Sequence, residues 1–457
     1  MKSRLFSPYW LPVWFMMAAI LIGSLLLLIP ECRSNQAASL SFVDSLFTST
    51  SAMCVTGLAV RDTGSFFSSA GQGVILALIQ LGGLGIMTYS SLALYLLGRK
   101  VSLTDRISVG QSLLRDPTFS LRRYVGRVIF GTLALELIGG VLLFTMDPTG
   151  FSPWSALFHA VSAFCNAGFS LFSNSLVGYR DHWGVNLVVM TLITLGGLGF
   201  VVLNECAVVG RRLLRRGPRH IVFGPEMFSF HSRLVLTMSA VLTIGGATII
   251  FLAEWQGGAI SASWDKLFLA SLFQSVTCRT AGFNTVEVAH LTNLTLLIML
   301  VLMFIGGSPG STAGGIKTTT ARLLIGYVAA QLRGCRQVVI GHNAMSRSTR
   351  GKAISLIVLA TFVVLLSIVM LEITECGDMP HHLVRGQFLE TLFEVVSAFG
   401  TVGLSMGKTA SLTSLGKIVI IILMFIGRIG PIWLLTALQD WRPETHYRIP
   451  ETDLPMG

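Results

Sequence analysis

Four short segments of the sequence carry a pattern that predicts chemistry by the backbone rather than by side chains. Each has a Leu-Phe pair and then a glycine nine or ten residues after the Phe. The segments are "SLFTSTSAMCVTGL" (45 to 58), "ALFHAVSAFCNAGF" (156 to 169), "SLFQSVTCRTAGF" (271 to 283) and "TLFEVVSAFGTVGL" (391 to 404). Glycine permits turns that a Cβ would hinder, so each segment can turn sharply and expose carbonyl oxygens. A ring of such oxygens can replace the water shell of an alkali cation.

These turns supply the predicted ion ligands. The carbonyls belong to the three residues that end at each glycine, namely Val55, Thr56, Gly57, Asn166, Ala167, Gly168, Thr280, Ala281, Gly282, Thr401, Val402 and Gly403. The alternative is that the glycines only let helices pack closely, as small residues do in membranes. That alternative is disfavoured, because the helix expected before each glycine is too short to span a bilayer.

A second candidate site interrupts an apolar run. The stretch "IGGSPGSTAGGIKTTT" (305 to 320) directly follows "LTLLIMLVLMF", so the helix is expected to break at membrane depth. Irregular backbone is tolerated there only where protein buries it or where it lines an aqueous path. The candidate residues are Gly306, Gly307, Ser308, Pro309, Gly310, Ser311, Thr312, Gly314, Gly315 and Lys317. A phosphate-binding loop is excluded, since Ile316 separates Gly315 from Lys317 and no strand precedes the run.

Arg428 is the third candidate. It follows the uncharged run "IVIIILMFIG" and occupies the position at which the other repeats have a second glycine. A charge at that depth is costly and is a functional hypothesis by default. The alternative is that Arg428 extends to the cytoplasmic boundary. His159 and Glu394 each follow a Leu-Phe pair directly, and packing or hydrogen bonding behind the turns is the favoured interpretation of both.

The elements that must position these residues are membrane helices. The chain has 457 residues, of which 52% are hydrophobic and 12% charged, and its mean hydropathy is +0.71. Several apolar runs reach the roughly 20 residues that cross a hydrocarbon core, which excludes a soluble globular protein. The first run, from about Tyr9 to Ile29, lacks a small-residue cleavage site and is interpreted as a retained span rather than a signal peptide.

The basic residues lie between the spans. The net charge is +11, and Lys and Arg cluster in three connections, 99–127, 211–233 and 317–352. Basic loops that follow alternate spans are expected on the cytoplasmic side. Nothing else indicates a nucleic-acid partner. The seven cysteines have no metal-ligand spacing, and their odd number argues against a disulfide framework.

The four segments predict an all-α membrane protein with four span, half-helix, span repeats around a central pore. Its units are 1–98, 99–210, 211–330 and 331–438, followed by a cytoplasmic tail, 439–457. Eight spans and four half-helices are expected, the latter at about 42–54, 153–165, 265–278 and 388–400, with Asp44 and Ser155 as candidate N-caps. The half-helices enter from the outer side, so their partly negative C-terminal ends point at the bilayer interior and attract cations.

These segments, the run 306–317 and the stretch "MFIGRIGP" resemble the Trk/Ktr/HKT superfamily of potassium transporters over essentially residues 9 to 438. Eight spans without an extra N-terminal pair resemble its KtrB group more than TrkH. The resemblance implies potassium as the substrate, possible use of sodium, and no organic cofactor bound by this chain. In the superfamily, a glycine in all four filter segments accompanies potassium preference. Only the first and fourth segments here are close to the channel-type Thr-Val-Gly, which implies a less symmetric and less selective pore.

The resemblance also implies a gate and partners. In the family, the loop matching 306–317 gates conduction below the filter, and an arginine at the position of Arg428 faces it. The implied partners are a second copy of the chain, membrane lipid, and a KtrA-like cytoplasmic ring of nucleotide-binding (RCK/KTN) subunits, with no nucleic acid. The implied location is a bacterial inner membrane, with both termini cytoplasmic.

Two alternatives remain open. The same fold could prefer sodium or carry both ions. An intramembrane enzyme would need convergent carboxylates, His or Cys with catalytic geometry, and Glu136, Glu205, Glu254 and His159 form no such set in the sequence. The favoured interpretation is a transporter subunit, not an enzyme.

Overall fold

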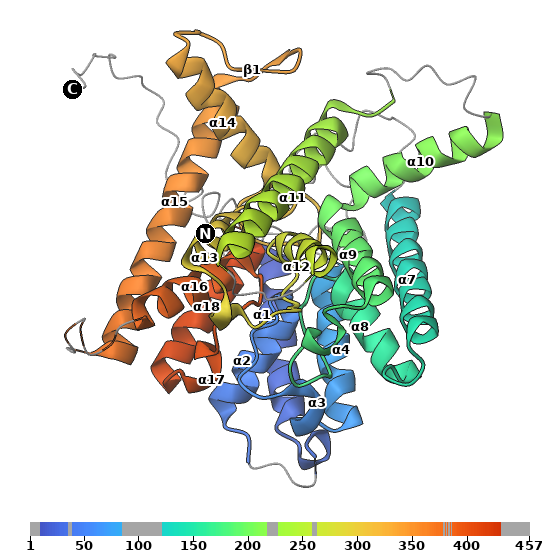
Figure 1. The fold of residues 1–457 in the computed structure, drawn as a ribbon, viewed down its shortest axis with the longest axis vertical. Helices are drawn as coiled ribbons and strands as arrows, with labels where there is room; N and C mark the ends of the chain where they lie inside the picture. The colour runs from blue at the N-terminus through green and yellow to red at the C-terminus, as the bar shows by residue number, and fades with distance from the viewer. Residues whose placement is uncertain are drawn as a thin grey trace, which may run out of the picture.

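The computed structural model describes residues 10–34, 39–84, 121–216, 227–257, 263–377, 380, 382, 384 and 386–430. The end of the first repeat after residue 84, most of the basic connection 99–127 and the predicted tail 439–457 lie outside the described residues. Within them the molecule is almost entirely helical, and its only strands pair in one short hairpin (Figure 1).

The N-terminal half contains two units of the same kind. Its main helices are α1 (Leu11–Leu27), α2 (Phe42–Met53), α4 (Ser69–Gly83), α7 (Leu121–Met146), α8 (Pro153–Phe164), α9 (Trp183–Leu198) and α10 (Phe200–Arg216). Short elements join them: η3 (Pro30–Cys32), α3 (Thr63–Phe66) and η4 (Val177–Tyr179). In each unit a short helix, α2 or α8, lies between two longer apolar segments.

The C-terminal half repeats the arrangement. Its main helices are α11 (Phe230–Gly257), α12 (Trp264–Thr277), α13 (Asn293–Phe304), α14 (Thr318–Leu332), α15 (Arg347–Leu371), α16 (Gln387–Gly400) and α18 (Ser414–Ile429). The short elements are η6 (Val288–His290), η7 (Glu372–Cys376), α17 (Lys408–Ser411), and strands β1 (Val339–Ile340) and β2 (Asn343–Ala344), which pair antiparallel.

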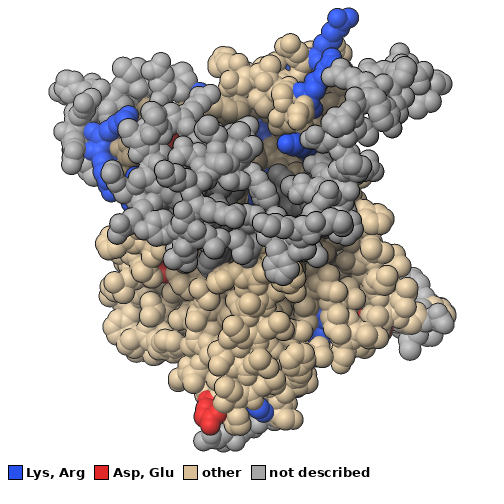
Figure 2. Space-filling view, turned by 180° about the vertical axis from the view of Figure 1, so that it is seen from behind, with Lys and Arg blue, Asp and Glu red and all other residues tan. Residues whose placement is uncertain are grey.

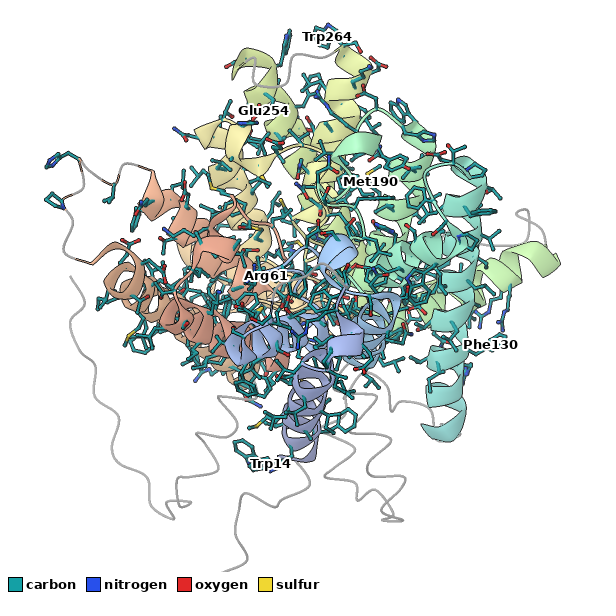
Figure 3. The ribbon with its side chains drawn as sticks, turned by 90° about the horizontal axis from the view of Figure 1, so that it is seen from below. Trp14, Arg61, Phe130, Met190, Glu254 and Trp264 are labelled. Carbon is teal, nitrogen blue, oxygen red and sulfur yellow. The ribbon has the colours of Figure 1, made fainter. Side chains whose placement is uncertain are left out.

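The four units surround a common centre. Figure 3 views the molecule from below and shows the units in chain order around this centre, with Trp14, Phe130 and Trp264 on the perimeter. The Phe of every Leu-Phe pair is fully buried: Phe47, Phe158, Phe273 and Phe393. The Leu-Phe marker in the sequence is therefore a packing position that anchors each short helix in the core.

The short helices begin and end within one residue of the predicted half-helices, but their N-caps differ from the prediction. Ser41 caps α2 by accepting a hydrogen bond from Asp44 N, and Ser152 caps α8 by accepting one from Ser155 N. The predicted caps, Asp44 and Ser155, are wrong. They lie at the third helical position, where the backbone N–H is the group that a cap satisfies.

The second apolar segment of a unit is not always one straight helix. The sequence led us to expect a break only in the third repeat, where residues 305–317 separate α13 from α14. The second repeat is also broken, because α9 and α10 meet at Gly199 with a bend of 110°. Gly199 has φ 86° and ψ 148°, a conformation that ends the helix and that glycine adopts without strain.

Spans can be assessed only for the described residues. There, α7, α11 and α15 with its continuation η7 are long and apolar enough to cross a membrane, and the bent pair α9 and α10 would pass as one span. Shorter apolar helices lie at Pro12–Leu27, Ser69–Gly83 and Asn293–Phe304. The number of eight spans stays a prediction.

Charge is distributed as a membrane protein requires. In Figure 2 Lys and Arg gather at the end of the molecule that carries α14 and the β1–β2 hairpin, while a broad band below it shows few charges. Many large apolar side chains are exposed among the described residues, and Phe130 on α7 is 76% exposed. Such a surface is stable only against hydrocarbon.

One ion-pair cluster joins the first and last units. Lys417 Nζ at the start of α18 lies 2.7 Å from Asp44 Oδ1 on α2, and Arg61 Nη2 lies 3.7 Å from Asp44 Oδ2. Asp44 is only 5% exposed. A carboxylate this deeply buried is costly unless it is paired, so Lys417 compensates a charge that would otherwise destabilise the closed ring of units.

We expect Lys417→Met to destabilise the protein by about 3 kcal/mol, because among the described residues it leaves the buried Asp44 carboxylate with only the more distant Arg61 as a cationic partner. Thermal unfolding in detergent measures the loss. The double variant Asp44→Asn with Lys417→Met should recover most of it, since no buried charge is left unpaired and the Arg61 side chain, at 43% exposure, is accessible to water. A double variant as unstable as the single one would contradict this account.

Candidate ion-conducting site

The four predicted glycines meet in a closed ring. All have positive φ: 94° at Gly57, 70° at Gly168, 80° at Gly282 and 94° at Gly403. A Cβ on each would collide with the carbonyl oxygen that precedes the next glycine around the ring: Ala167 O at 2.5 Å, Ala281 O at 2.8 Å, Val402 O at 2.4 Å and Thr56 O at 2.0 Å, respectively. Conformation and space therefore both require glycine at these positions.

The first residue of each triplet is also in the left-handed region. Its φ is 56° at Val55, 58° at Asn166, 72° at Thr280 and 50° at Thr401. Three of these residues are β-branched, for which the conformation is rare and costs energy. The backbone turns here directly after each short helix, so the partly negative helix ends face the ring.

A second set of glycines packs the apolar helices against the short ones. A Cβ on Gly82 would lie 2.1 Å from Met53 O, one on Gly196 1.9 Å from Phe164 O, and one on Gly427 2.1 Å from Phe399 O. Each of these carbonyls belongs to the last turn of a short helix. Gly82, Gly196 and Gly427 thus allow close backbone packing, the role that small residues have in membranes.

The irregular segment 305–317 lies directly against the ring. A Cβ on Gly314 would lie 2.2 Å from Thr401 Oγ1, and one on Gly306 would lie 3.4 Å from Thr280 Cγ2. Ile305 and Ile316 form an isolated parallel bridge, so the segment leaves α13 and returns to the same level before α14 begins. Ser308 and Thr312 are buried at 0% and 1% exposure, and residues 309–311 between them are half-buried.

The bend between α9 and α10 holds this segment. Ser308 N donates to Gly197 O at 3.1 Å, Thr312 N to Gly196 O at 3.3 Å, and Phe200 N to Gly310 O at 3.2 Å. The Ser308 hydroxyl also donates to Leu198 O. The break at Gly199 leaves backbone N–H and C=O groups without partners in the helix, and residues 308–312 bond to them. The irregular backbone of the bend and that of the segment 305–317 therefore hydrogen-bond to each other.

Two cations hold the other side of the segment. Arg428 on α18 is 7% exposed and donates hydrogen bonds to Thr312 O and to Gly82 O. Lys317 Nζ donates to Ala313 O at 2.6 Å. Arg428 is therefore enclosed by protein, and it bridges the irregular segment to the first repeat.

The polar residues after the Leu-Phe pairs hold the chain beyond the ring. His159 Nε2 lies 2.9 Å from Ser170 Oγ, and Ser405 Oγ donates to Glu394 Oε2 at 2.7 Å. Thr409 also donates to Glu394. Both serines follow a ring glycine by two residues, so the expected role behind the turns agrees with this geometry.

Two further buried polar groups are held by hydrogen bonds, and of these only Arg279 was absent from the sequence-based predictions. Arg279, at the end of α12 next to Thr280, donates from Nη2 to Ser239 Oγ at 3.1 Å and from Nη1 to Ser239 O at 3.3 Å. Glu136 on α7 accepts from Gln80 Nε2 at 3.1 Å and from Cys165 Sγ at 3.5 Å. Arg279 is the one charged residue of the segment 271–283, a signal that the sequence offered. Among the described residues, no group of three or more His, Cys, Asp or Glu could hold a metal ion.

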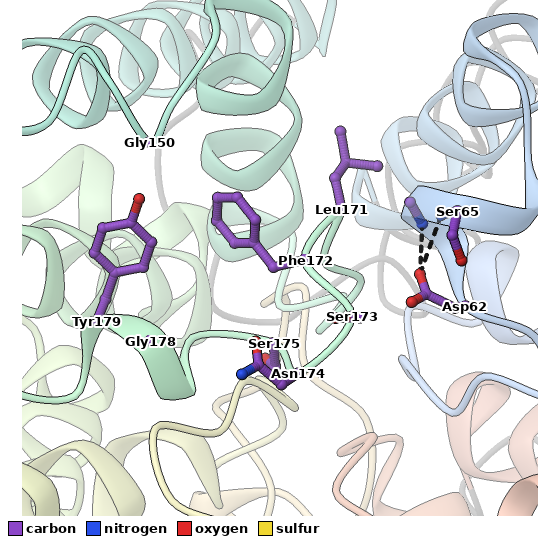
Figure 4. A pocket seen from close by; sticks show the side chains of 11 residues that line it. Asp62, Ser65, Gly150, Leu171, Phe172, Ser173, Asn174, Ser175, Gly178 and Tyr179 are labelled. Carbon is purple, nitrogen blue, oxygen red and sulfur yellow. Dashed lines mark hydrogen bonds between the residues drawn. The ribbon is translucent and has the colours of Figure 1, made fainter.

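A cavity of about 570 Å³ lies beside the chain that leaves the first two ring segments (Figure 4). Asp62 Oδ1 accepts from Gly64 N at 2.8 Å on one side, and Tyr179 lies on the other. Hydrogen bonds from Thr149, Gly150 and Tyr179 to Asp147 hold the pKa of this carboxyl at about 2. Burial and the neighbouring Asp147 raise the pKa of Tyr179 to about 12. The Tyr179 hydroxyl therefore keeps its proton at neutral pH and continues to donate to Asp147.

Comparison with known proteins adds the family context. The family model "TrkH: Cation transport protein" matches residues 14–440. The chain is 40% identical over 462 residues to Ktr system potassium uptake protein B of Bacillus subtilis, covering 99% of this chain and 97% of that protein. It is 36% identical over 431 residues to the protein of the same name from Vibrio alginolyticus, covering 92% of this chain and 89% of the other.

Two further comparisons bear on the ion and the fold. The chain is 33% identical over 446 residues to potassium/sodium uptake protein NtpJ of Enterococcus hirae, covering 96% of this chain and 94% of that protein. The crystal structure of the potassium transporter TrkH from Vibrio parahaemolyticus is similar with a TM-score of 0.72 at 22% identity, covering 96% of this chain and 87% of that one. This likeness supports the fold.

Proposed function

The chain belongs to the TrkH family of cation transport proteins, and on that premise we propose that it is the pore-forming membrane subunit of a potassium uptake system. Members of the family are transporters, not enzymes. The observation that carries the proposal is the closed ring of four glycine turns, each preceded by the C-terminal end of a buried short helix. Four helix dipoles and a layer of carbonyl oxygens favour a dehydrated monovalent cation at the centre.

In this proposal the twelve residues of the four triplets, from Val55 to Gly403, form the selectivity filter, and potassium is the substrate. No organic cofactor is required. The domains are the four repeats, 1–98, 99–210, 211–330 and 331–438, with the tail 439–457. The close approach of Gly314 to Thr401 supports a gate formed by residues 306–317 with Arg428, because the segment lies directly against the ring and Arg428 is bonded to it.

A pore that carries sodium as well is the second candidate. The resemblance to a relative named for potassium and sodium uptake favours it. The sequence of the ring also favours reduced discrimination, because its four triplets, Val-Thr-Gly, Asn-Ala-Gly, Thr-Ala-Gly and Thr-Val-Gly, differ from one another. The two candidates share the site and differ only in the ion that the carbonyl ring prefers.

The partners follow from the same relatives. Similarity to the B component of Ktr systems supports a cooperating Ktr subunit, which we propose is a cytoplasmic ring of nucleotide-binding subunits. The basic end of the molecule with α14 and the β1–β2 hairpin would face the cytoplasm, and so would both termini. We further propose a homodimer in a bacterial inner membrane.

Uptake of rubidium-86 into proteoliposomes that contain the purified chain tests the proposal, with potassium, sodium and lithium as separate competitors. Competition by potassium alone is the expected result. Equal competition by sodium would replace it with the second candidate. Absence of uptake, both from the chain alone and after addition of the cytoplasmic ring subunit, would overturn the proposal.

Replacing Gly57 with Ser should reduce the preference for potassium over sodium by about tenfold or more, because the Cβ collides with Ala167 O and the residue has φ 94°. The potassium-to-sodium uptake ratio measures the effect. Gly73→Ser is the matched control: this glycine lies on α4, and a Cβ added to it would meet no atom within 4 Å, so its ratio should stay unchanged. An unaltered ratio in Gly57→Ser would remove Gly57 from the filter.

Removing the Arg428 side chain should raise ion flux. Arg428→Ala frees Thr312 O and Gly82 O, and deletion of Ser308 to Gly314 removes the segment itself. We expect both variants to increase rubidium uptake several-fold without the ring subunit. Arg333→Ala, on the exposed end of α14, is the control. If neither variant changes flux, the segment is not a gate.

A further inference from the structure

Each short helix presents a hydroxyl at the same position. The fourth residue after the Phe of the Leu-Phe pair is Ser or Thr in all four repeats: Ser51, Ser162, Thr277 and Ser397. All four are 0% exposed. Their backbone carbonyls accept from the second residue of the following triplet, at 2.8 Å from Thr56 N, 2.7 Å from Ala167 N, 2.9 Å from Ala281 N and 2.8 Å from Val402 N. This backbone contact is the same in all four repeats.

The hydrogen bonds of the hydroxyls differ between the repeats. In the first and fourth repeats the hydroxyl accepts from the ring glycine, Gly57 N to Ser51 Oγ and Gly403 N to Ser397 Oγ, both at 3.1 Å. In the second and third repeats the hydroxyl donates to the carbonyl after the ring glycine, Ser162 Oγ to Phe169 O at 2.7 Å and Thr277 Oγ1 to Phe283 O at 2.6 Å. The hydroxyls therefore divide the ring into two adjacent pairs of repeats.

The first bonding mode sets the direction of a ring carbonyl. The N–H and C=O of a trans peptide point in opposite directions, so an N–H held by the short helix leaves its C=O pointing away from that helix. The carbonyl that shares a peptide with Gly57 N is Thr56 O, and the one that shares a peptide with Gly403 N is Val402 O. These two oxygens face the neighbouring ring glycines, Gly403 and Gly282, respectively.

The second mode acts on a different peptide. The bonded carbonyls of Phe169 and Phe283 point at their own short helices, so they are withdrawn from the centre of the ring. Loss of this bond leaves a carbonyl with an unused lone pair, which costs less than a buried N–H without an acceptor. The sequence marks the same division, because the residue after the ring glycine is Leu58 or Leu404 in one pair of repeats and Phe169 or Phe283 in the other.

We propose that Ser51 and Ser397 are specificity-determining positioning residues, which hold the Thr56 and Val402 carbonyls toward the ion path, whereas Ser162 and Thr277 mainly anchor the chain beyond the ring. This inference rests on the proposed function, because it assigns ion discrimination to the same ring. Neither serine contacts the ion; each acts through the glycine peptide that follows it. Discrimination between potassium and sodium is accordingly concentrated in the pair formed by the first and fourth repeats.

The test compares Ser51→Ala and Ser397→Ala with Ser162→Ala and Thr277→Val in the full-length protein, by the potassium-to-sodium ratio of competed rubidium uptake. The first two variants leave a half-buried glycine N–H without its acceptor, and a peptide rotation that relieves this turns a ring carbonyl outward. Loss of one such hydrogen bond corresponds to a drop of about fivefold in the ratio. We expect less than about twofold for the other two variants, whose bonded group is a carbonyl.

Ser49 supplies a matched control. It lies on the same helix, is 0% exposed, and its hydroxyl has no hydrogen-bond partner among the described residues. Ser49→Ala should leave the ratio unchanged. Ser51→Thr, which keeps the hydroxyl, should restore it. The backbone bonds of Ser51 and Ser397 do not involve their side chains, so the variants are expected to fold, and size-exclusion elution verifies this.

The outcomes separate the two hypotheses. A wild-type protein without potassium preference would reject the proposed filter, whatever the serine variants do. A wild-type protein that prefers potassium, with Ser51→Ala and Ser397→Ala at the wild-type ratio or all four hydroxyl variants equal, would reject only the positioning role. If an Ala variant does not elute as folded protein, Ser51→Cys and Ser397→Cys, whose sulfur is a weak acceptor, carry the same test.

Discussion

The approach of four backbones at the ring is the constraint on which the rest of the structure depends. Each glycine Cα meets the carbonyl before the next glycine so closely that no side chain fits between them. Such contact inside a bilayer requires that all surrounding backbone groups find partners within the protein. The short helices, the hydroxyls at their C-terminal ends and the second set of glycines on α4, α9 and α18 all serve that requirement. The large buried Phe residues then give each short helix a fixed depth.

Much of this arrangement could be predicted from the sequence, because it repeats. A Leu-Phe pair and a glycine at constant separation locate the short helices to within one residue. Local signals were less reliable. Asp44 and Ser155 resemble helix caps by type, but Ser41 and Ser152 stand where a side chain can reach the third N–H. The bend at Gly199 was missed because "LGGLGF" resembles a continuous apolar run, and only the hydrogen bonds to residues 308–312 explain the break.

The candidate site, too, could be predicted from the sequence only in part. The positions of Gly57, Gly168, Gly282 and Gly403 followed from spacing, and the hydroxyls of Ser51 and its equivalents were equally visible at a constant offset from Phe. What the hydroxyls bond to was not visible, since Ser51 and Ser162 have identical positions in the repeat and opposite hydrogen-bonding roles. That difference depends on whether the hydroxyl meets the N–H of the ring glycine or the carbonyl of the residue after it. Likewise, the sequence marks Arg279 as unusual, yet its partner Ser239 lies forty residues away on α11.

The contact between Lys417 and Asp44 spans 373 residues of chain. The ring closes through the same two units, where Gly403 meets Thr56 O. Contacts of such long sequence separation form late, after the shorter loops have closed. The ring of glycine turns and the contact of Arg428 with the irregular segment therefore cannot form until the last repeat has been synthesised, whatever the first three repeats have already built.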